Sequence, residues 1–313
     1  MATSGNTDYT VTAGEVINDA FEDLGVIAVG ETAPAEYSLG ALRTLNTLVK
    51  QMMGGPKPLC PSIKMWKRKH LVLDLTANEK YTVKIRRLPF TSGGTTAIAV
   101  GNTITGATSA ATAKIMSVDL SSGTWAGGSA AGEFMIESQT GTFAAENLNV
   151  GVATNLATIA ANSAQYGPPL DILEAVRRNA TGEDSPMLPM TLAEYMAIGD
   201  KDAEGTPLRY YFEKRIDDFI LYLDCKPKVT TDNIVMVVQL PLEDLDGLTN
   251  HLDLPREWFR HIKFALAQDL LPKYPSSKDR EKLIIGLAAQ SQIAANTFEP
   301  DDAVAYFQPD LDD

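Results

Sequence analysis

Cysteine and histidine are scarce in this chain of 313 residues. It has two cysteines, Cys60 and Cys225, and three histidines, His70, His251 and His261. The two cysteines stand too far apart in sequence for a CxxC metal site or a disulfide framework. The histidines show neither HExxH nor HxH spacing, the spacings typical of zinc sites. We therefore predict no metal site and no cofactor.

Catalytic motifs are also missing. The sequence has no GxSxG nucleophile elbow and no GK[ST] phosphate loop. Adjacent carboxylates occur, for example Asp217-Asp218, but a chain with 40 acidic residues contains such pairs by chance. A glycosidase needs two carboxylates that face each other across a cleft, and adjacency in sequence does not supply that geometry. We predict that the protein is not an enzyme and has no catalytic residues.

Long apolar runs and an excess of basic charge are absent too. No stretch reaches the 18 or so apolar residues that a membrane-spanning helix needs, so we predict no membrane span. The formal net charge is −13. Proteins that grip duplex DNA neutralise its phosphates with Lys and Arg, so this charge argues against an ordinary duplex-gripping protein.

Charge and proline are nearly absent from one internal segment, residues 90–166. It holds ten of the 23 glycines, none of the 17 prolines and only five charged residues. Short β-like runs divided by Gly-rich turns predict an inserted antiparallel barrel or sandwich. Trp125 is its largest apolar residue. We interpret Trp125 as a core or turn anchor, with an exposed binding aromatic as the alternative.

The two ends of the chain carry helical patterns. Thr12 and Glu15 have the spacing of a capping box at the start of an apolar stripe. A second helix is expected from Pro34 to the Gly54-Gly55 pair. Two further helices are expected after Pro255 and after Ser276 or Ser277. We expect these terminal helices to form a helical bundle.

Between the helices, several runs are rich in β-branched and aromatic residues. "LVLDL" and "YTVKI", separated by "TANE", predict a β-hairpin, and "LRYYFE", "FILYLD" and "NIVMVVQL" predict further strands. "DILEAVRR" is compatible with either a strand or a helix. The predicted fold class is therefore α+β: terminal helices in a bundle, a small antiparallel sheet between them, and an inserted all-β barrel or sandwich module. The expected segments are 1–89 (helical hairpin and first strands), 90–166 (insert), 167–253 (rest of the sheet), 254–296 (C-terminal helices) and 297–313 (acidic docking tail).

Two short stretches are candidate contact sites. The first is the densest basic cluster, Lys64, Lys67, Arg68 and Lys69, which flanks Trp66 and has the basic-aromatic mix of a nucleic-acid surface. Its alternative role is a solvated basic edge that pairs with acids of a neighbouring subunit. The second is the tail, where six acids accompany three aromatic residues that we predict to be partner-binding: Phe298, Tyr306 and Phe307. Its alternative role is a solvated tail that maintains solubility.

Three stretches of the chain resemble tailed-bacteriophage head-to-tail adaptor proteins, also called tail accessory factors or packaged-DNA stabilisation proteins. The stretches are "TAGEVINDAFEDLGVIAVGETAPAEYSLGALRTLNTLVKQM", "MTLAEYMAIGDKDAEGTPLRYYFEKRIDDFILYLDCKP" and "LPLEDLDGLTNHLDLPREWFRHIKFALAQDLLPKY". The resemblance covers roughly residues 12–85 and 168–296, and the insert departs from the family pattern.

The resemblance implies a structural virion protein at the neck or tail, present in the host cytoplasm during assembly. About twelve copies would form a ring under the portal protein, contact tail nozzle, tube or fibre proteins, and continue the channel through which genomic DNA passes. Acidic residues that face this channel would repel the duplex and let it slide. Two alternatives are a nozzle or tube ring component further down the tail, and a virion-associated glycan-binding or lytic protein whose Trp125 stacks on sugar.

Overall fold

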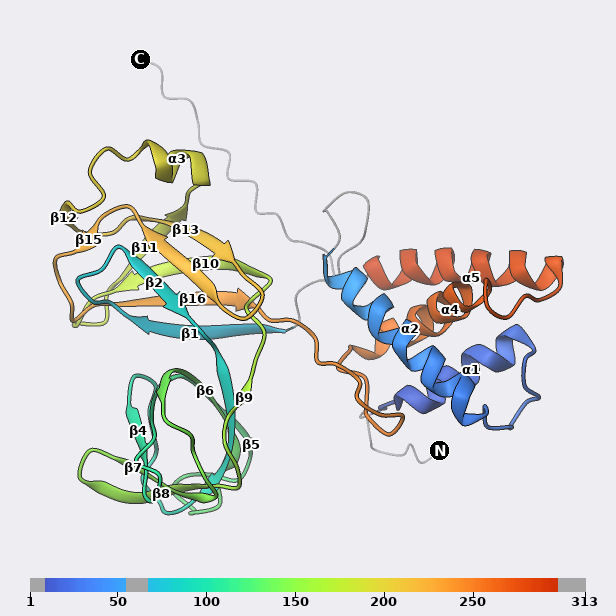
Figure 1. Ribbon diagram of the computed structural model, residues 1–313, viewed down its shortest axis with the longest axis horizontal. Helices are drawn as coiled ribbons and strands as arrows, with labels where there is room; N and C mark the ends of the chain where they lie inside the picture. The colour runs from blue at the N-terminus through green and yellow to red at the C-terminus, as the bar shows by residue number, and fades with distance from the viewer. Residues whose placement is uncertain (1–8, 55–66, 298–313) are drawn as a thin grey trace, which may run out of the picture. The chain divides into compact units, whose positions relative to one another are not determined.

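The structure is a computed structural model that describes residues 9–54 and 67–297. Within these residues the chain forms sixteen β-strands and five α-helices, and helices account for 26% of it. The predicted fold class is therefore wrong. The protein is mostly β: it has a seven-stranded sheet where a small sheet was expected, together with a closed six-stranded barrel, so it is not a terminal helical bundle with a small sheet. Two compact units can be separated: a helical unit, residues 1–66 and 242–313, and a β unit, residues 67–241 (Figure 1).

The helical unit contains α1 (Ala13–Leu24), α2 (Ala35–Gly54), α4 (Arg256–Leu270) and α5 (Lys278–Thr297). The capping box predicted at the start of α1 is confirmed. The Glu15 amide donates to the Thr12 hydroxyl at 3.2 Å, and the Glu15 carboxylate accepts from the Thr12 amide at 2.7 Å. Gly25 then ends α1 in the left-handed conformation, with φ 75°.

One apolar core holds the four helices together. Its largest fully buried side chains are Trp258, Phe21, Ile17 and Leu45. The segment after residue 241 is fixed to α2 by the side chain of Asn46. That amide donates to the Leu245 carbonyl and accepts from the Leu245 amide, each at 2.9 Å. Two stretches that are far apart in sequence therefore share a single core.

The larger sheet of the β unit has the strand order β1-β16-β10-β11-β13-β14-β2. All neighbours are antiparallel except β11 and β13. The bounds are β1 (Arg68–Asp74), β2 (Lys80–Val83), β10 (Asp171–Arg178), β11 (Asp184–Pro189), β13 (Arg209–Lys214), β14 (Phe219–Leu223) and β16 (Asn233–Gln239). One face buries a core that includes Leu71, Phe219, Leu221 and Met236.

The predicted hairpin between the first two strands is wrong. β1 pairs with β16 and β2 pairs with β14, so the two strands lie at opposite ends of the strand order. Their connection is instead held by Tyr81. Its hydroxyl accepts from the Thr76 amide at 2.9 Å and donates to the Thr76 carbonyl at 2.7 Å. The turn chemistry is local, but the pairing partners come from distant parts of the chain.

The barrel consists of β3 (Arg86–Ser92), β4 (Thr103–Gly106), β5 (Thr112–Ser122), β6 (Ala131–Thr140), β7 (Glu146–Val150) and β8 (Ala153–Ile159). The order β6-β5-β4-β7-β8-β3 closes on itself because β3 also pairs with β6. Closure leaves no exposed strand edge. The short β9 (Ala164–Gln165) pairs with the start of β3.

Aromatic stacking fills one end of the barrel. The Phe90 and Phe134 rings stack with centroids 4.0 Å apart, and Trp125 stacks on Phe90 at 5.1 Å. Trp125 is partly buried against the barrel core. This packing agrees with the interpretation of Trp125 as a core anchor.

The barrel and the larger sheet are joined by charged and apolar contacts. Lys69 and Asp74 of β1 pair with Asp119 and Lys114 of β5, respectively. Met116 of β5 and Met135 of β6 point away from the barrel core and belong to the core of the sheet. The barrel therefore covers part of the sheet's apolar face.

Small elements complete the β unit. They are α3 (Leu192–Ala197) and the paired strands β12 (Glu204–Gly205) and β15 (Lys226–Pro227). The α3 residue Tyr195 packs on Tyr222 of β14, with ring centroids 4.9 Å apart. No helix in residues 9–54 or 67–297 is both long enough and apolar enough to cross a membrane.

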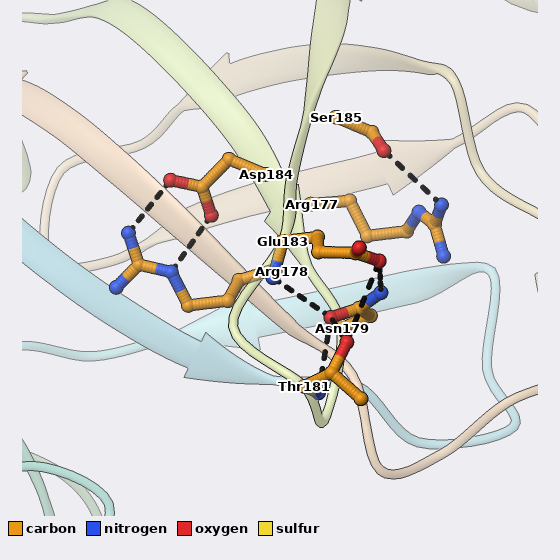
Figure 2. Close-up of polar contacts among 7 residues, drawn as sticks. All are labelled: Arg177, Arg178, Asn179, Thr181, Glu183, Asp184 and Ser185. Atoms are coloured by element: carbon orange, nitrogen blue, oxygen red, sulfur yellow. Dashed lines mark hydrogen bonds and ion pairs between the residues drawn. The ribbon is translucent and has the colours of Figure 1, made fainter.

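Figure 2 shows how polar side chains shape the turn between β10 and β11. The Asn179 side-chain oxygen accepts from the Glu183 amide at 2.8 Å and from the Thr181 amide at 3.0 Å. Next to the turn, Arg178 and Asp184 form a bidentate ion pair. Nε of Arg178 donates to Oδ1 of Asp184 at 2.7 Å, and Nη2 donates to Oδ2 at 2.8 Å. "DILEAVRR" is thus a strand, and its hairpin register is set at the turn.

Candidate functional site

The residues of the predicted basic cluster have different surroundings in the structure. Lys67 lies 5.8 Å from the centroid of the Tyr166 ring, and Lys69 pairs with Asp119 of the same chain. Arg68 is exposed at the start of β1. Lys64 lies outside the described residues. One alternative for the cluster was pairing with acids of a neighbouring subunit. For Lys69 the acid instead belongs to the same chain: it is Asp119 of the barrel.

The predicted partner-binding aromatics of the tail, Phe298, Tyr306 and Phe307, also lie outside the described residues. Among residues 9–54 and 67–297, no group of three or more His, Cys, Asp and Glu side chains is placed to hold a metal ion. A different candidate site, which the sequence reasoning missed, is present in the helical unit.

This site is a groove of about 340 Å³ between α2, α4 and α5, which we call the helical groove. Each helix contributes residues at helical spacing, so that one side of each faces the groove. The apolar lining residues are Leu48, Met52, Ala265, Ile285, Ala288 and Ala289. The groove thus brings α2 together with α4 and α5, two consecutive helices that follow α2 by about 200 residues in sequence.

An apolar stripe on α5 borders the helical groove. Ile285, Ala289 and Ile293 follow one another at intervals of four residues and lie on one side of the helix. Ile285 is 48% exposed and Ile293 is 67% exposed. The side that packs into the unit carries other residues, among them Ile284 and Ala295. A helix that is apolar on more than one side is typical of buried helices, so α5 has an apolar surface that its own unit does not cover.

The polar groups of the groove comprise three glutamines, Asp269 and His261. Partial burial raises the pKa of Asp269, and no cation in the described part of the chain pairs with its carboxylate. An acid in such a position favours a cationic group on whatever enters the groove.

His261 forms part of the groove wall and is itself buried. Its Nδ1 lies 3.4 Å from the hydroxyl oxygen of Ser291, and that hydroxyl donates to the Ala288 carbonyl at 2.9 Å. Burial lowers the pKa of His261, which favours the neutral imidazole at neutral pH. His261 therefore ties α4 to α5 and adds no charge to the groove.

Other large apolar side chains of the helical unit are exposed outside the groove. Leu39 of α2 is 55% exposed, and Val29 of the preceding loop is also exposed. Leu39 precedes the groove residue Leu48 by nine positions, which corresponds to about 14 Å along the helix axis and to the opposite side of the helix. Leu39 is therefore an exposed apolar residue on a side of α2 that does not face the groove.

No family model matches the chain, and no curated protein matches it significantly.

Proposed function

We propose that the protein is a structural subunit of a phage head-to-tail connector and that it assembles into a ring through the helical groove. The observation that carries the proposal is the uncovered apolar stripe of α5 beside this groove. Burying one large apolar side chain stabilises an interface by about 1.5–3 kcal/mol. The resemblance to head-to-tail adaptors supplies the biological setting, in which the ring lies under the portal protein.

The occupant of the groove is a second copy of this chain. Because Leu39 lies on the side of α2 opposite the groove, contact between that side of one copy and the groove of the next is head-to-tail. Such contacts generate a closed ring when the rotation between copies closes, and an open filament when it does not. A two-fold dimer would instead need one surface that is complementary to itself.

The charge of the chain fits a DNA conduit better than a DNA clamp. Each copy has 40 acidic residues and 27 basic residues, so a ring would carry a large excess of carboxylates. Carboxylates along a channel repel the phosphate backbone and keep the duplex from binding to the wall. In this proposal the genomic DNA passes through the ring, and no base is read.

Native mass spectrometry of the full chain, alone and with purified portal protein, tests the proposal. We expect rings of about twelve copies for the natural sequence. Ile293→Asp introduces a charge into the stripe and is expected to leave monomers. Ile216→Asp is the matched control, because Ile216 is 93% exposed at the β13–β14 turn of the β unit. A monomer that ignores the portal, or equal behaviour of the two variants, contradicts the proposal.

A further inference from the structure

A second concave site lies in the β unit, where the chain passes from β2 to β3 beside the end of β6. Its volume is about 330 Å³, and two cationic side chains, Lys84 and Arg86, line it. None of the residues that line this cleft is acidic. In a chain with a net charge of −13, a cleft whose lining carries two positive charges and no negative charge is unusual.

A hydrogen-bond network holds the cleft wall in place. Arg86 donates from Nε to the Ser163 hydroxyl at 2.6 Å and from Nη2 to the Ser163 carbonyl at 2.8 Å. The Ser163 hydroxyl contacts the side-chain oxygen of Gln139. Gln139 in turn donates to the Asn162 side-chain oxygen at 3.1 Å, and so does the Phe143 amide. The guanidinium and the Asn162 amide are thereby fixed before any ligand arrives.

Several hydrogen-bond donors at the cleft have no acceptor within this network. Both bonds to the Asn162 oxygen orient its amide, and Nδ2 of that amide has no acceptor among the described residues. Nη1 of Arg86 and the ammonium group of Lys84 likewise have none within the part of the chain that the structure covers. A cleft that offers charged donors without a protein acceptor, and that has no carboxylate in its lining, is complementary to an oxyanion.

We propose that this cleft binds a phosphate group carried on a small, hydroxyl-rich molecule such as a sugar phosphate. The phosphate lies between Lys84 and Arg86, because guanidinium and ammonium groups are the usual partners of phosphate oxygens. The hydroxyls of Thr82, Ser138 and Thr142 also line the cleft and face the sugar hydroxyls. The volume is at the lower end of the range for small-molecule sites and exceeds what a bare phosphate ion fills.

The backbone at the wall is also unusual. Ser138 has φ 51° and Gly141 has φ 76°, both in the left-handed region. A non-glycine residue in this region is strained and persists only where its surroundings hold it. Ser138 lies within β6, where the register with β5 shifts between Thr112 and Lys114, and this irregularity places Ser138 at the cleft. The inference does not depend on ring assembly, since all the residues concerned lie in the β unit.

Isothermal titration calorimetry of the full chain at low ionic strength tests the proposal, with glucose 6-phosphate as the probe. We expect saturable binding that weakens at least tenfold when salt is raised, because the interaction is largely ionic. Inorganic phosphate is expected to bind more weakly than the probe, and glucose without phosphate is expected not to bind. Equal affinity for phosphate and probe would overturn the sugar part of the proposal.

The variant Lys84→Glu reverses one of the two charges at an exposed position, and we expect it to weaken binding at least tenfold. Lys228→Glu is the matched control: Lys228 is exposed in the same unit, its backbone bonds Gly205, and the charge change is identical. We expect less than a twofold effect there. Arg86 is left unchanged, because its bonds to Ser163 also tie β3 to the chain after the barrel.

Circular dichroism of both variants checks that the β unit stays folded. A wild-type protein that gives no saturable heat with either phosphate compound overturns the proposal. So does a Lys84→Glu variant that binds as well as the control. If folding of Lys84→Glu is impaired, Asn162→Asp, which removes the free amide donor and adds a negative charge, is expected to show the same loss.

Discussion

The Glu146 carboxylate accepts a hydrogen bond of 2.6 Å from the backbone amide of Thr108, across 38 residues of sequence. The same carboxylate accepts from the Thr108 hydroxyl, from the amide and hydroxyl of Ser109, and from the Ala144 amide. Five donors thus converge on one side chain and hold the β4–β5 turn against β7. Burial raises the pKa of Glu146, but the hydrogen bonds together outweigh burial and lower the pKa to about 2.

Replacing this carboxylate should destabilise the barrel. In Glu146→Gln, an amide NH₂ faces donors and the charge that strengthens the bonds is lost. Hydrogen bonds to charged groups contribute about 1.5–3 kcal/mol each, so we expect a loss of at least 2 kcal/mol. Hydrogen exchange of the Thr108 and Ser109 amides measures the effect locally. Glu174→Gln is the control, because Glu174 is exposed on β10; equal exchange in both variants would contradict the prediction.

The pKa of Glu146 also predicts acid sensitivity. Because the folded value, about 2, lies below the ordinary 4.5, the stabilisation is complete above pH 4.5 and is lost as the pH falls towards 2. Urea unfolding of the β unit between pH 5 and pH 3 should therefore show falling stability. In Glu146→Gln this part of the pH dependence should vanish, and its persistence would point to other carboxylates.

Glu137 should have the opposite pH dependence. It is buried opposite Lys114 on the neighbouring strand, and Lys114 pairs with Asp74. Burial raises the pKa of Glu137 to about 7, partly opposed by Lys114. The folded state then binds a proton more tightly than the unfolded state, so stability is greatest below pH 4.5 and decreases as the pH rises to 7.

The corresponding variant is Glu137→Gln, which cannot ionise. At about 1.4 kcal/mol per pKa unit, it should be more stable than the natural protein at pH 8 by up to about 3 kcal/mol. At pH 4 the two should be similar. Denaturant unfolding at both pH values measures this, and a variant that is less stable at pH 8 would show that Glu137 is needed in its charged form.

The contact between barrel and sheet gives a further prediction. Met116 and Met135 are buried in the sheet core although both belong to barrel strands. Truncating a buried methionine to alanine costs about 2–5 kcal/mol. We expect Met116→Ala to lower the unfolding midpoint of the β unit markedly. Met196→Ala, at a position that is 65% exposed on α3, should leave it within error.

The turn in Figure 2 can be tested in the same way. Asn179→Ala removes the acceptor for the Thr181 and Glu183 amides, and net loss of about 1 kcal/mol per hydrogen bond is expected. Asn179→Asp keeps the acceptor for both amides but loses the side-chain donor to the Glu183 carboxylate at 2.7 Å, so it should retain part of the stability. Faster hydrogen exchange at residues 181 and 183 in Asn179→Ala alone is the expected outcome; equal exchange in both variants would show that the turn is held elsewhere.

Local features of the fold were predictable because their causes are local. The capping boxes at Thr12 and at Thr191 each need only four consecutive residues, and both are present. The composition of residues 90–166 likewise indicated a β module, since short alternating runs and Gly-rich turns are properties of neighbouring residues. The proportion of strand to helix and the pairing of the strands were not predictable in this way. "DILEAVRR" is too short for its period to separate strand from helix, and β16, its hydrogen-bonding partner, lies more than 50 residues further on.

The sequence by itself determined where helices begin, where turns fall and that charge and cysteine are scarce in particular places. Only the tertiary structure decided that β1 and β2 pair with other strands and that Lys69 meets Asp119. It also decided that Leu48, Asp269 and Ile285 line one groove, and that Lys84 and Asn162 line one cleft. The physical reason is that pairing and enclosure depend on which distant surfaces bury each other. Residues that are many positions apart carry no periodic signal of that choice.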